Sequence, residues 1–239
     1  MGVFHFKRFD VVNEQSSMKV NTDGVILGAA VTLRDDDRRV LDVGTGTGTV
    51  ALMIAQRLEG APSSITGIDI DAPSAAEAAS NFAASPWADK LRAIHVPLRE
   101  YEADEQLDLV VSNPPYFDNS LQAPDERRNV ARHTEVGDSL SYRELAEFAG
   151  RRLSDTGRLA LILPADQEKP LLRCLRSYGL HPFRVLYVRT TPRKAPARIV
   201  VEASRIRPDS MELDTLTIQE GGEYTAAYLA LTHDFYLFA

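Results

Sequence analysis

The segment Asp42-Val43-Gly44-Thr45-Gly46-Thr47-Gly48 decides the fold of this 239-residue chain. It follows the short apolar run 40–43, which is typical of a buried strand. Behind it, apolar residues recur at helical spacing: Val50, Met53, Ile54 and Leu58. Glycines between a strand and a helix let the backbone turn tightly and approach a ligand closely. The helix start also offers unpaired N–H groups. The segment therefore predicts a strand, a turn and a helix, with a binding site at the turn.

Strands and helices alternate along the rest of the chain. Apolar runs typical of strands lie at 40–43, 65–70, 91–96, 107–111, 159–163, 183–188 and 198–203. Ser141 and Glu144 have capping-box spacing at the start of one helix between them. A last helical face is expected to pack in the core: Tyr224, Ala227, Tyr228 and Leu231. The alternation predicts an α/β fold, a doubly wound parallel sheet covered on both faces. Ligands of such sheets bind at the carboxyl ends of the strands.

Composition and charge exclude several classes of protein. The longest apolar run, 50–55, is far shorter than the about 20 residues of a membrane span. The single cysteine, Cys174, excludes an internal disulfide and a cysteine-rich zinc site. The net charge of −7 gives no overall attraction to nucleic acid, although basic residues cluster at 127–132 and 189–198. We expect a cytoplasmic protein without a membrane segment or a metal.

Two carboxylates near the glycine turn suggest which cofactor it binds. Asp69 ends the second strand, where a carboxylate can accept hydrogen bonds from the hydroxyls of a ribose. Asp42 would repel a phosphate, but it suits a cationic amino-acid tail. The spacing is Gly-x-Gly-x-Gly, not the Gly-x-Gly-x-x-Gly that leaves room for a pyrophosphate. S-adenosylmethionine (SAM) has a cationic tail, a ribose and no phosphate. The sequence favours SAM, and a nicotinamide dehydrogenase remains an alternative.

The tetrad Asn113-Pro114-Pro115-Tyr116 directly follows the apolar run 107–111. The two prolines fix the backbone and remove two N–H donors, which leaves carbonyl groups to act as acceptors. The Asn113 side-chain oxygen is a further acceptor, and Tyr116 offers an aromatic face for stacking. Two acceptors can hold the hydrogens of a planar NH₂ group while the nitrogen lone pair turns toward a methyl group. The tetrad therefore predicts methyl transfer to a planar amine.

Both motifs resemble those of known enzymes. The glycine turn is similar to motif I of the class I SAM-dependent methyltransferases. The tetrad is similar to the signature of enzymes that methylate adenine N6, guanine N2 or a glutamine amide. Four further segments extend the likeness over nearly the whole chain: 18–29, 51–57, 131–133 and 234–237. Together they resemble the bacterial tRNA1(Val) (adenine(37)-N6)-methyltransferase family. Where that family often has glycine, this chain has Asn21, which suits a helix cap.

The resemblance implies the architecture. It implies a single methyltransferase domain, 1–239, composed of an N-terminal cap or lid, 1–37, and a Rossmann-like core, 38–239. The core is expected to hold a mostly parallel seven-stranded sheet with its last strand antiparallel. It also implies SAM as cofactor, tRNA as partner, a monomer, and the N6 amine of adenine 37 in tRNA1(Val) as acceptor.

The resemblance further implies roles for individual residues. The expected catalytic residues are Asn113, Pro114, Pro115 and Tyr116. The expected SAM-binding residues are Thr22, Asp42, Gly44, Thr45, Gly46, Gly48, Asp69, Ile70 and Leu98. Here Pro97-Leu98 stands where many members carry an aspartate, so backbone groups and Leu98 packing are expected to contact the SAM adenine. The expected RNA contacts are Lys19, Arg127, Arg128, Arg132, His133, Arg193, Lys194 and Arg198.

Two alternatives share the same fold. The first is a glutamine-amide methyltransferase of a protein release factor. Such enzymes usually carry a separate N-terminal helical domain, whereas only 37 residues precede Arg38 here. The second is a SAM-fold RNA-binding module without activity, and the intact tetrad argues against it.

Overall fold

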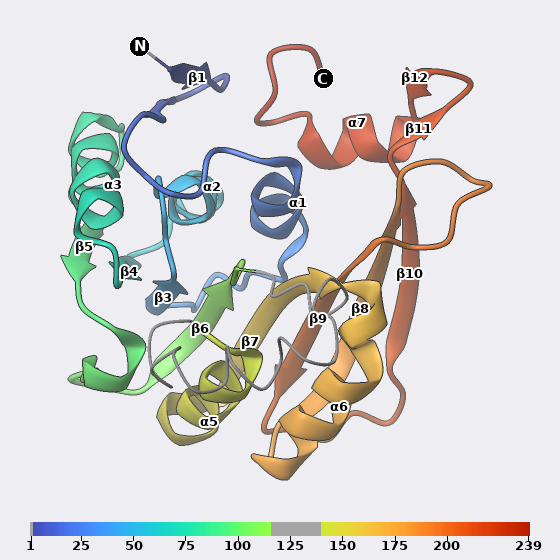
Figure 1. Cartoon of the computed structure of the whole chain (residues 1–239). Helices are drawn as coiled ribbons and strands as arrows, with labels where there is room; N and C mark the ends of the chain where they lie inside the picture. The colour runs from blue at the N-terminus through green and yellow to red at the C-terminus, as the bar shows by residue number, and fades with distance from the viewer. Residues whose placement is uncertain (1, 116–139) are drawn as a thin grey trace, which may run out of the picture.

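The structure, a computed structural model, describes residues 2–115 and 140–239 (Figure 1). Its main sheet has eight strands in the order β10-β8-β9-β7-β6-β3-β4-β5. These strands are β3 (Arg39–Val43), β4 (Ser64–Asp69), β5 (Leu91–His95), β6 (Leu107–Ser112), β7 (Leu153–Pro164), β8 (His181–Arg189), β9 (Arg198–Ser204) and β10 (Glu212–Thr217). Two small hairpins pair β1 (Val3–His5) with β2 (Asp10–Val12), and β11 (Gln219–Glu220) with β12 (Glu223–Tyr224).

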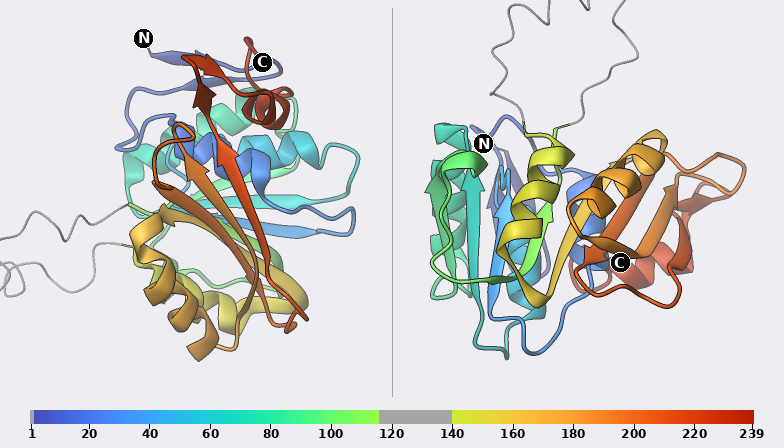
Figure 2. Two further views of the ribbon diagram at one scale, coloured as in Figure 1. Left: turned by 90° about the vertical axis from the view of Figure 1, so that its right-hand side faces the viewer. Right: turned by 90° about the horizontal axis from the view of Figure 1, so that it is seen from below.

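Helices cover both faces of the main sheet (Figure 2). The α-helices are α1 (Thr22–Ala30), α2 (Thr49–Arg57), α3 (Ala72–Ala84), α5 (Tyr142–Arg152), α6 (Glu168–Ser177) and α7 (Ala226–Thr232). Two short 3₁₀ helices follow β5 and β7, η1 (Leu98–Glu100) and η2 (Ala165–Gln167). The predicted capping box is present, because the side chains of Ser141 and Glu144 each bond the other's backbone N–H. Among the residues described, no helix is both long and apolar enough to cross a bilayer.

The predicted α/β fold with a mostly parallel sheet is confirmed. The seven predicted strands correspond to β3 through β9, and β9 runs antiparallel to both β7 and β8. The predicted count is one short, because β10 adds an eighth strand that pairs in parallel with β8. In β10 only Leu216 is buried, so this edge strand lacks the apolar run by which the others are recognised.

The two faces of the sheet form two separate hydrophobic cores. Helices α1, α2, α3 and α7 pack on one core, and α5 and α6 pack on the other. Neighbouring strand residues alternate between them: Val40 belongs to the first and Leu41 to the second. At the C-terminus the predicted apolar face is wrong in part. Tyr228 is buried, but Tyr224 and Ala227 are exposed. Tyr224 does not share the helical face, since α7 begins only at Ala226.

Gly48 caps the N-terminus of α2 where this helix packs against α3. Its φ of 83° lies in the left-handed region, and an added Cβ would lie 2.4 Å from Cε1 of Phe82. Phe82 is buried in the first core and cannot move aside without disturbing its neighbours. Only glycine satisfies both constraints at this position.

We therefore expect Gly48→Ala to lower the free energy of unfolding by about 2–4 kcal/mol, from backbone strain and overpacking. Gly60→Ala is the matched control, because nothing lies within 4 Å of a Cβ at Gly60. Urea denaturation of both variants measures the difference. Equal stability of the two variants would show that α2 and α3 can separate without cost.

Candidate active site

The carboxyl ends of β3, β4 and β6 meet at one edge of the sheet. Strand β3 pairs in parallel with β4 on one side and with β6 on the other. The chain order reverses between β3 and β6, and such a switch point opens a crevice for ligands. Ser112 Oγ donates a hydrogen bond of 2.7 Å to the Val43 carbonyl, which ties the ends of β6 and β3 together. The residues after these strands are thereby brought to one place.

The glycine turn is held against Asp69 at the end of β4. The Gly46 N–H donates to Asp69 Oδ2 at 2.8 Å, and the Asp71 N–H donates to Asp69 Oδ1 at 2.9 Å. Burial raises the pKa of Asp69, although these two N–H donors act in the opposite direction. Each carboxylate oxygen keeps a second lone pair, so Asp69 can still accept hydrogen bonds from a ligand.

Asp42 is a buried carboxyl group at the end of β3, only 1% exposed. Burial raises its pKa to about 7, although the hydrogen bond from Thr45 Oγ1, at 2.7 Å, lowers it. A carboxylate removed from water in this way gains strongly from a nearby cation. Asp42 therefore suits the ammonium group of an amino-acid tail.

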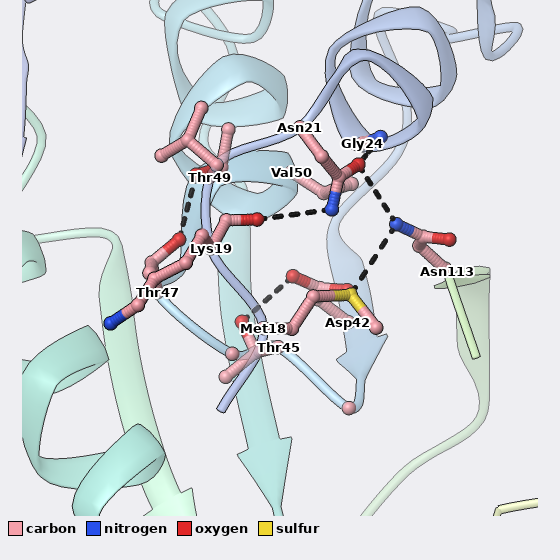
Figure 3. A pocket seen from close by; sticks show the side chains of 13 residues that line it. Met18, Lys19, Asn21, Gly24, Asp42, Thr45, Thr47, Thr49, Val50 and Asn113 are labelled. Carbon is pink, nitrogen blue, oxygen red and sulfur yellow. Dashed lines mark hydrogen bonds between the residues drawn. The ribbon is translucent and has the colours of Figure 1, made fainter. Parts of the chain in front are cut away.

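A pocket at this edge brings together predicted cofactor and catalytic residues (Figure 3). It is lined by 13 residues from three regions of the chain: Met18, Lys19, Val20, Asn21, Gly24, Asp42, Gly44, Thr45, Gly46, Thr47, Thr49, Val50 and Asn113. The glycine turn forms one wall, and Asn113, which follows β6, stands opposite residues 18–21. A backbone-lined turn beside a buried carboxyl group fits the amino-acid part of SAM, and the adjacent Asp69 fits its ribose.

The N-terminal segment, residues 13–21, is held over this pocket by residues that were not predicted from the sequence. Glu77 of α3 accepts hydrogen bonds from the backbone N–H groups of Glu14, Gln15 and Ser16, at 2.7, 2.8 and 2.9 Å. Burial opposes the ionisation of Glu77, but these donors outweigh it and hold its pKa below the usual value. Asn81 bonds the N–H and the carbonyl of Val12.

A signal for these contacts was present in the sequence. Ser74, Glu77 and Asn81 are spaced three and four residues apart, so they form one polar stripe on the alanine-rich helix α3. All three side chains are buried. A buried polar stripe requires partners. Glu77 and Asn81 bond backbone groups of residues 12–16. The Ser74 hydroxyl bonds Ser16 Oγ and Asp71 Oδ2, and Asn81 also bonds the Thr47 carbonyl of the glycine turn.

Five of the predicted SAM-binding residues do not line this pocket. Gly48 and Asp69 adjoin it, because Gly48 caps α2 and Asp69 accepts from the Gly46 N–H, and the other three lie further away. Thr22 is exposed in the first turn of α1. Ile70 follows Asp69 and is 45% exposed, which leaves an apolar surface next to the predicted ribose contact. Leu98 begins η1 and lines a separate hollow with Tyr101 and Phe148. Their roles stay predictions.

The predicted RNA contacts lie in different surroundings. Lys19 Nζ donates to the Glu14 carbonyl at 2.8 Å. Arg198 Nε forms an ion pair of 2.8 Å with Asp23 Oδ2 of α1. Arg193 and Lys194 are exposed in the loop between β8 and β9. Because Arg198 pairs with Pro164 at the carboxyl end of β7, this loop lies at the same edge of the sheet as the pocket.

Some of the predicted residues lie outside the described part of the chain. They are Tyr116 of the tetrad and the RNA contacts Arg127, Arg128, Arg132 and His133. Of the described tetrad residues, Asn113 and Pro114 are buried and Pro115 is exposed. Within ranges 2–115 and 140–239, no three His, Cys, Asp or Glu side chains are grouped as a metal site would require.

Comparisons with known proteins point to a family of methyltransferases. A family model described as the methyltransferase small domain matches residues 16–175. A relative from Phocaeicola vulgatus is 40% identical over 235 residues, which cover 98% of this chain and 97% of that protein. One from Flavobacterium johnsoniae is 36% identical over 238 residues, covering 98% and 99%. Both are named tRNA1(Val) (adenine(37)-N6)-methyltransferase.

Solved structures share the fold at low sequence identity. A predicted O-methyltransferase from Agrobacterium tumefaciens aligns with a TM-score of 0.65 and 18% identity, covering 88% of this chain and 95% of that chain. A putative class I SAM-dependent methyltransferase from Listeria monocytogenes aligns with a TM-score of 0.60 and 16% identity, covering 86% and 68%. These likenesses support the fold.

The raised pKa of Asp42 predicts that SAM binding depends on pH. As the pH falls below about 7, the Asp42 carboxyl takes up a proton that a cationic tail must displace. SAM affinity is expected to fall by up to about tenfold per pH unit between roughly pH 7 and 5.5. Asp42→Asn should bind SAM more weakly at neutral pH and lose this dependence. Calorimetry measures both, and a wild-type affinity that is constant over this range would contradict the contact.

Asp42→Asn weakens SAM binding, but it is expected to stabilise the ligand-free protein at neutral pH. The folded pKa of Asp42 is raised, so the stability of the ligand-free protein falls as the pH rises from about 4 to about 7. Asp42→Asn removes this loss, because its amide does not ionise. Thermal unfolding of the two proteins across this range serves as the control that weak SAM binding does not come from a damaged fold.

Proposed function

Because this chain belongs to the tRNA1(Val) (adenine(37)-N6)-methyltransferase family, we propose that it methylates the N6 amine of adenine 37 in tRNA1(Val). The chain is a SAM-dependent methyltransferase by family and by fold. The observation that carries the proposal is the position of Asn113 in the same pocket as the glycine turn and Asp42. The names of the relatives favour tRNA adenine over the glutamine amide of a release factor.

The residues of the pocket are suited to hold SAM in one orientation. Asp42 would bind the ammonium of its amino-acid tail, the backbone of residues 44–48 would border the rest of that tail, and Asp69 would accept from the ribose. When bound, SAM supplies a methyl group on a sulfonium centre. The unpaired backbone N–H groups at the start of α2 would be available to the carboxylate of the tail.

Asn113 is proposed to align the target amine. An adenine N6 amine is a poor nucleophile, because its lone pair is delocalised into the ring. The Asn113 side-chain oxygen and the Pro114 carbonyl would accept its two hydrogens, so that the nitrogen becomes pyramidal and its lone pair leaves the ring conjugation and points at the methyl carbon. The nitrogen then loses one proton after it has formed the new bond to carbon, so a strong base is not required. Positioning is the main contribution of these residues.

The tRNA is proposed to lie across the edge of the sheet that carries the pocket. The exposed Arg193 and Lys194 are at this edge and can contact phosphates. Arg127, Arg128, Arg132 and His133 are proposed as further contacts on the strength of the family resemblance alone. We also propose that the enzyme acts as a monomer in the cytoplasm, where its tRNA substrate is found.

The substrate can be tested with purified protein, SAM and three RNAs. These are tRNA1(Val), the same tRNA with guanine at position 37, and an unrelated tRNA. Mass spectrometry of the nucleosides should find N6-methyladenosine only in the first. Asn113→Ala should lower turnover by about 100-fold or more while SAM still binds, because the lost contact acts mainly in the transition state. N6-methyladenosine in the guanine-37 tRNA would contradict the proposed position.

The RNA face can be tested by the salt dependence of binding. Each phosphate contact contributes about 0.7 to the slope of log affinity against log salt on single-stranded RNA. The double substitution of Arg193 and Lys194 by alanine should flatten this slope by up to about 1.4. The matched control replaces Arg173 and Arg176, two exposed cations of α6. If both double variants change the slope equally, general charge rather than the β8–β9 loop holds the RNA.

A further inference from the structure

Asn21 makes two hydrogen bonds that determine which end of its side-chain amide faces the pocket. Its Oδ1 accepts from the Gly24 N–H at 2.9 Å, as the N-cap of α1. Its Nδ2 donates to the Lys19 carbonyl at 3.0 Å. A rotation of this amide by 180° would place NH₂ against N–H and oxygen against oxygen. Oδ1 is therefore fixed as the atom that Asn21 presents at the start of α1.

The same oxygen faces the side chain of Asn113. Asn113 Nδ2 lies 3.4 Å from Asn21 Oδ1 and 3.7 Å from Met18 Sδ, and both of these atoms are acceptors (Figure 3). A carboxamide oxygen in the place of Nδ2 would face these two acceptors instead of donating to them. In Figure 3 the oxygen end of Asn113 points away from Asn21 and Met18.

We infer that Asn21 is a positioning residue, which orients the Asn113 amide so that its oxygen, and not its NH₂ group, faces the target amine. This inference rests on the role of Asn113 proposed above. An Asn113 amide in the opposite orientation would present a donor to the amine hydrogens and could not align the nitrogen lone pair. Asn21 thus selects the competent orientation of a residue that touches the substrate.

The position of Asn21 is itself fixed from two directions. Toward its N-terminal side, the three hydrogen bonds of Glu77 hold the backbone of residues 14–16 against α3. Toward its C-terminal side, Asn21 is attached to α1, whose residues 24–30 are all buried. The contact between Asn21 Oδ1 and Asn113 Nδ2 measures 3.4 Å, near the limit of a hydrogen bond. Because the chain is restrained on both sides of Asn21, this contact can still orient the Asn113 amide.

Two substitutions separate capping from orientation. Serine caps a helix as well as asparagine, but its oxygen is one bond closer to the backbone. A hydroxyl group can also donate as well as accept, so it tolerates either orientation of Asn113. Aspartate is an equally good cap and keeps a carboxylate oxygen at the place of Oδ1. Both variants lose the hydrogen bond from Nδ2 to the Lys19 carbonyl. They differ in the orienting contact, which Asn21→Ser removes and Asn21→Asp keeps.

The experiment compares turnover at saturating SAM and tRNA with the melting temperature. Asn21→Ser is expected to lower kcat by about fivefold to tenfold, the worth of one hydrogen bond, with an unchanged melting temperature and nearly unchanged KM for tRNA. Asn21→Asp should restore most of kcat. Wild-type kcat in Asn21→Ser, or an equal loss in both variants, would overturn the inference.

A double-mutant cycle tests whether Asn21 acts through Asn113. In single-turnover measurements, adding Asn21→Ser to Asn113→Ala should change the rate by less than about twofold, because the residue to be oriented is gone. A full additional loss would show that Asn21 acts independently, and the inference would be wrong. If Asn113→Ala alone had near-normal activity, the proposed role of Asn113 would fail instead, so the two failures are distinguishable.

Discussion

The site depends on the parallel pairing of β3 between β4 and β6. Because parallel strands end at the same edge, the residues that follow Val43, Asp69 and Ser112 meet although up to 69 positions separate them in the chain. Without this arrangement, the glycine turn, the ribose-type carboxylate and the Asn113 tetrad would be three unrelated segments. The hydrogen bond from Ser112 to the Val43 carbonyl ties the start of the tetrad to the start of the glycine turn.

Two carboxyl groups near this edge, Asp42 and Glu77, differ in the hydrogen-bond donors that contact them. Asp42 is fully buried, and its pKa rises to about 7 because burial outweighs its two donors, the Thr45 hydroxyl and the Ala51 backbone N–H. Glu77 is buried with three backbone donors, and its pKa falls. Asp42 is suited to bind a cationic ligand, and its ionisation lowers the stability of the ligand-free protein. The carboxylate of Glu77 holds the N-terminal segment. Polar partners, and not burial alone, separate a binding group from a structural one.

Most of the fold could be predicted from the sequence, because apolar runs and helical spacing record which residues face a core. Seven strands were recognised in this way, whereas β10 was missed because only Leu216 of its residues is buried. The exposed Tyr224 was misjudged because the start of α7 depends on the cap Thr225 and not on apolar spacing. Edge strands and helix ends carry little apolar signal, so patterns locate them poorly.

The residues that carry the chemistry of the site could be predicted from the sequence alone: the glycine turn, Asp42, Asp69 and the tetrad that begins at Asn113. Their residue types and their places after strands already indicated a cofactor and a planar amine. Only the tertiary structure decided how the N-terminal segment lies over them, with Glu77 holding residues 14–16 and Asn21 facing Asn113 across the pocket. The physical reason is that local patterns specify strands, turns and caps, whereas hydrogen bonds between distant segments form only when packing has brought the partners together.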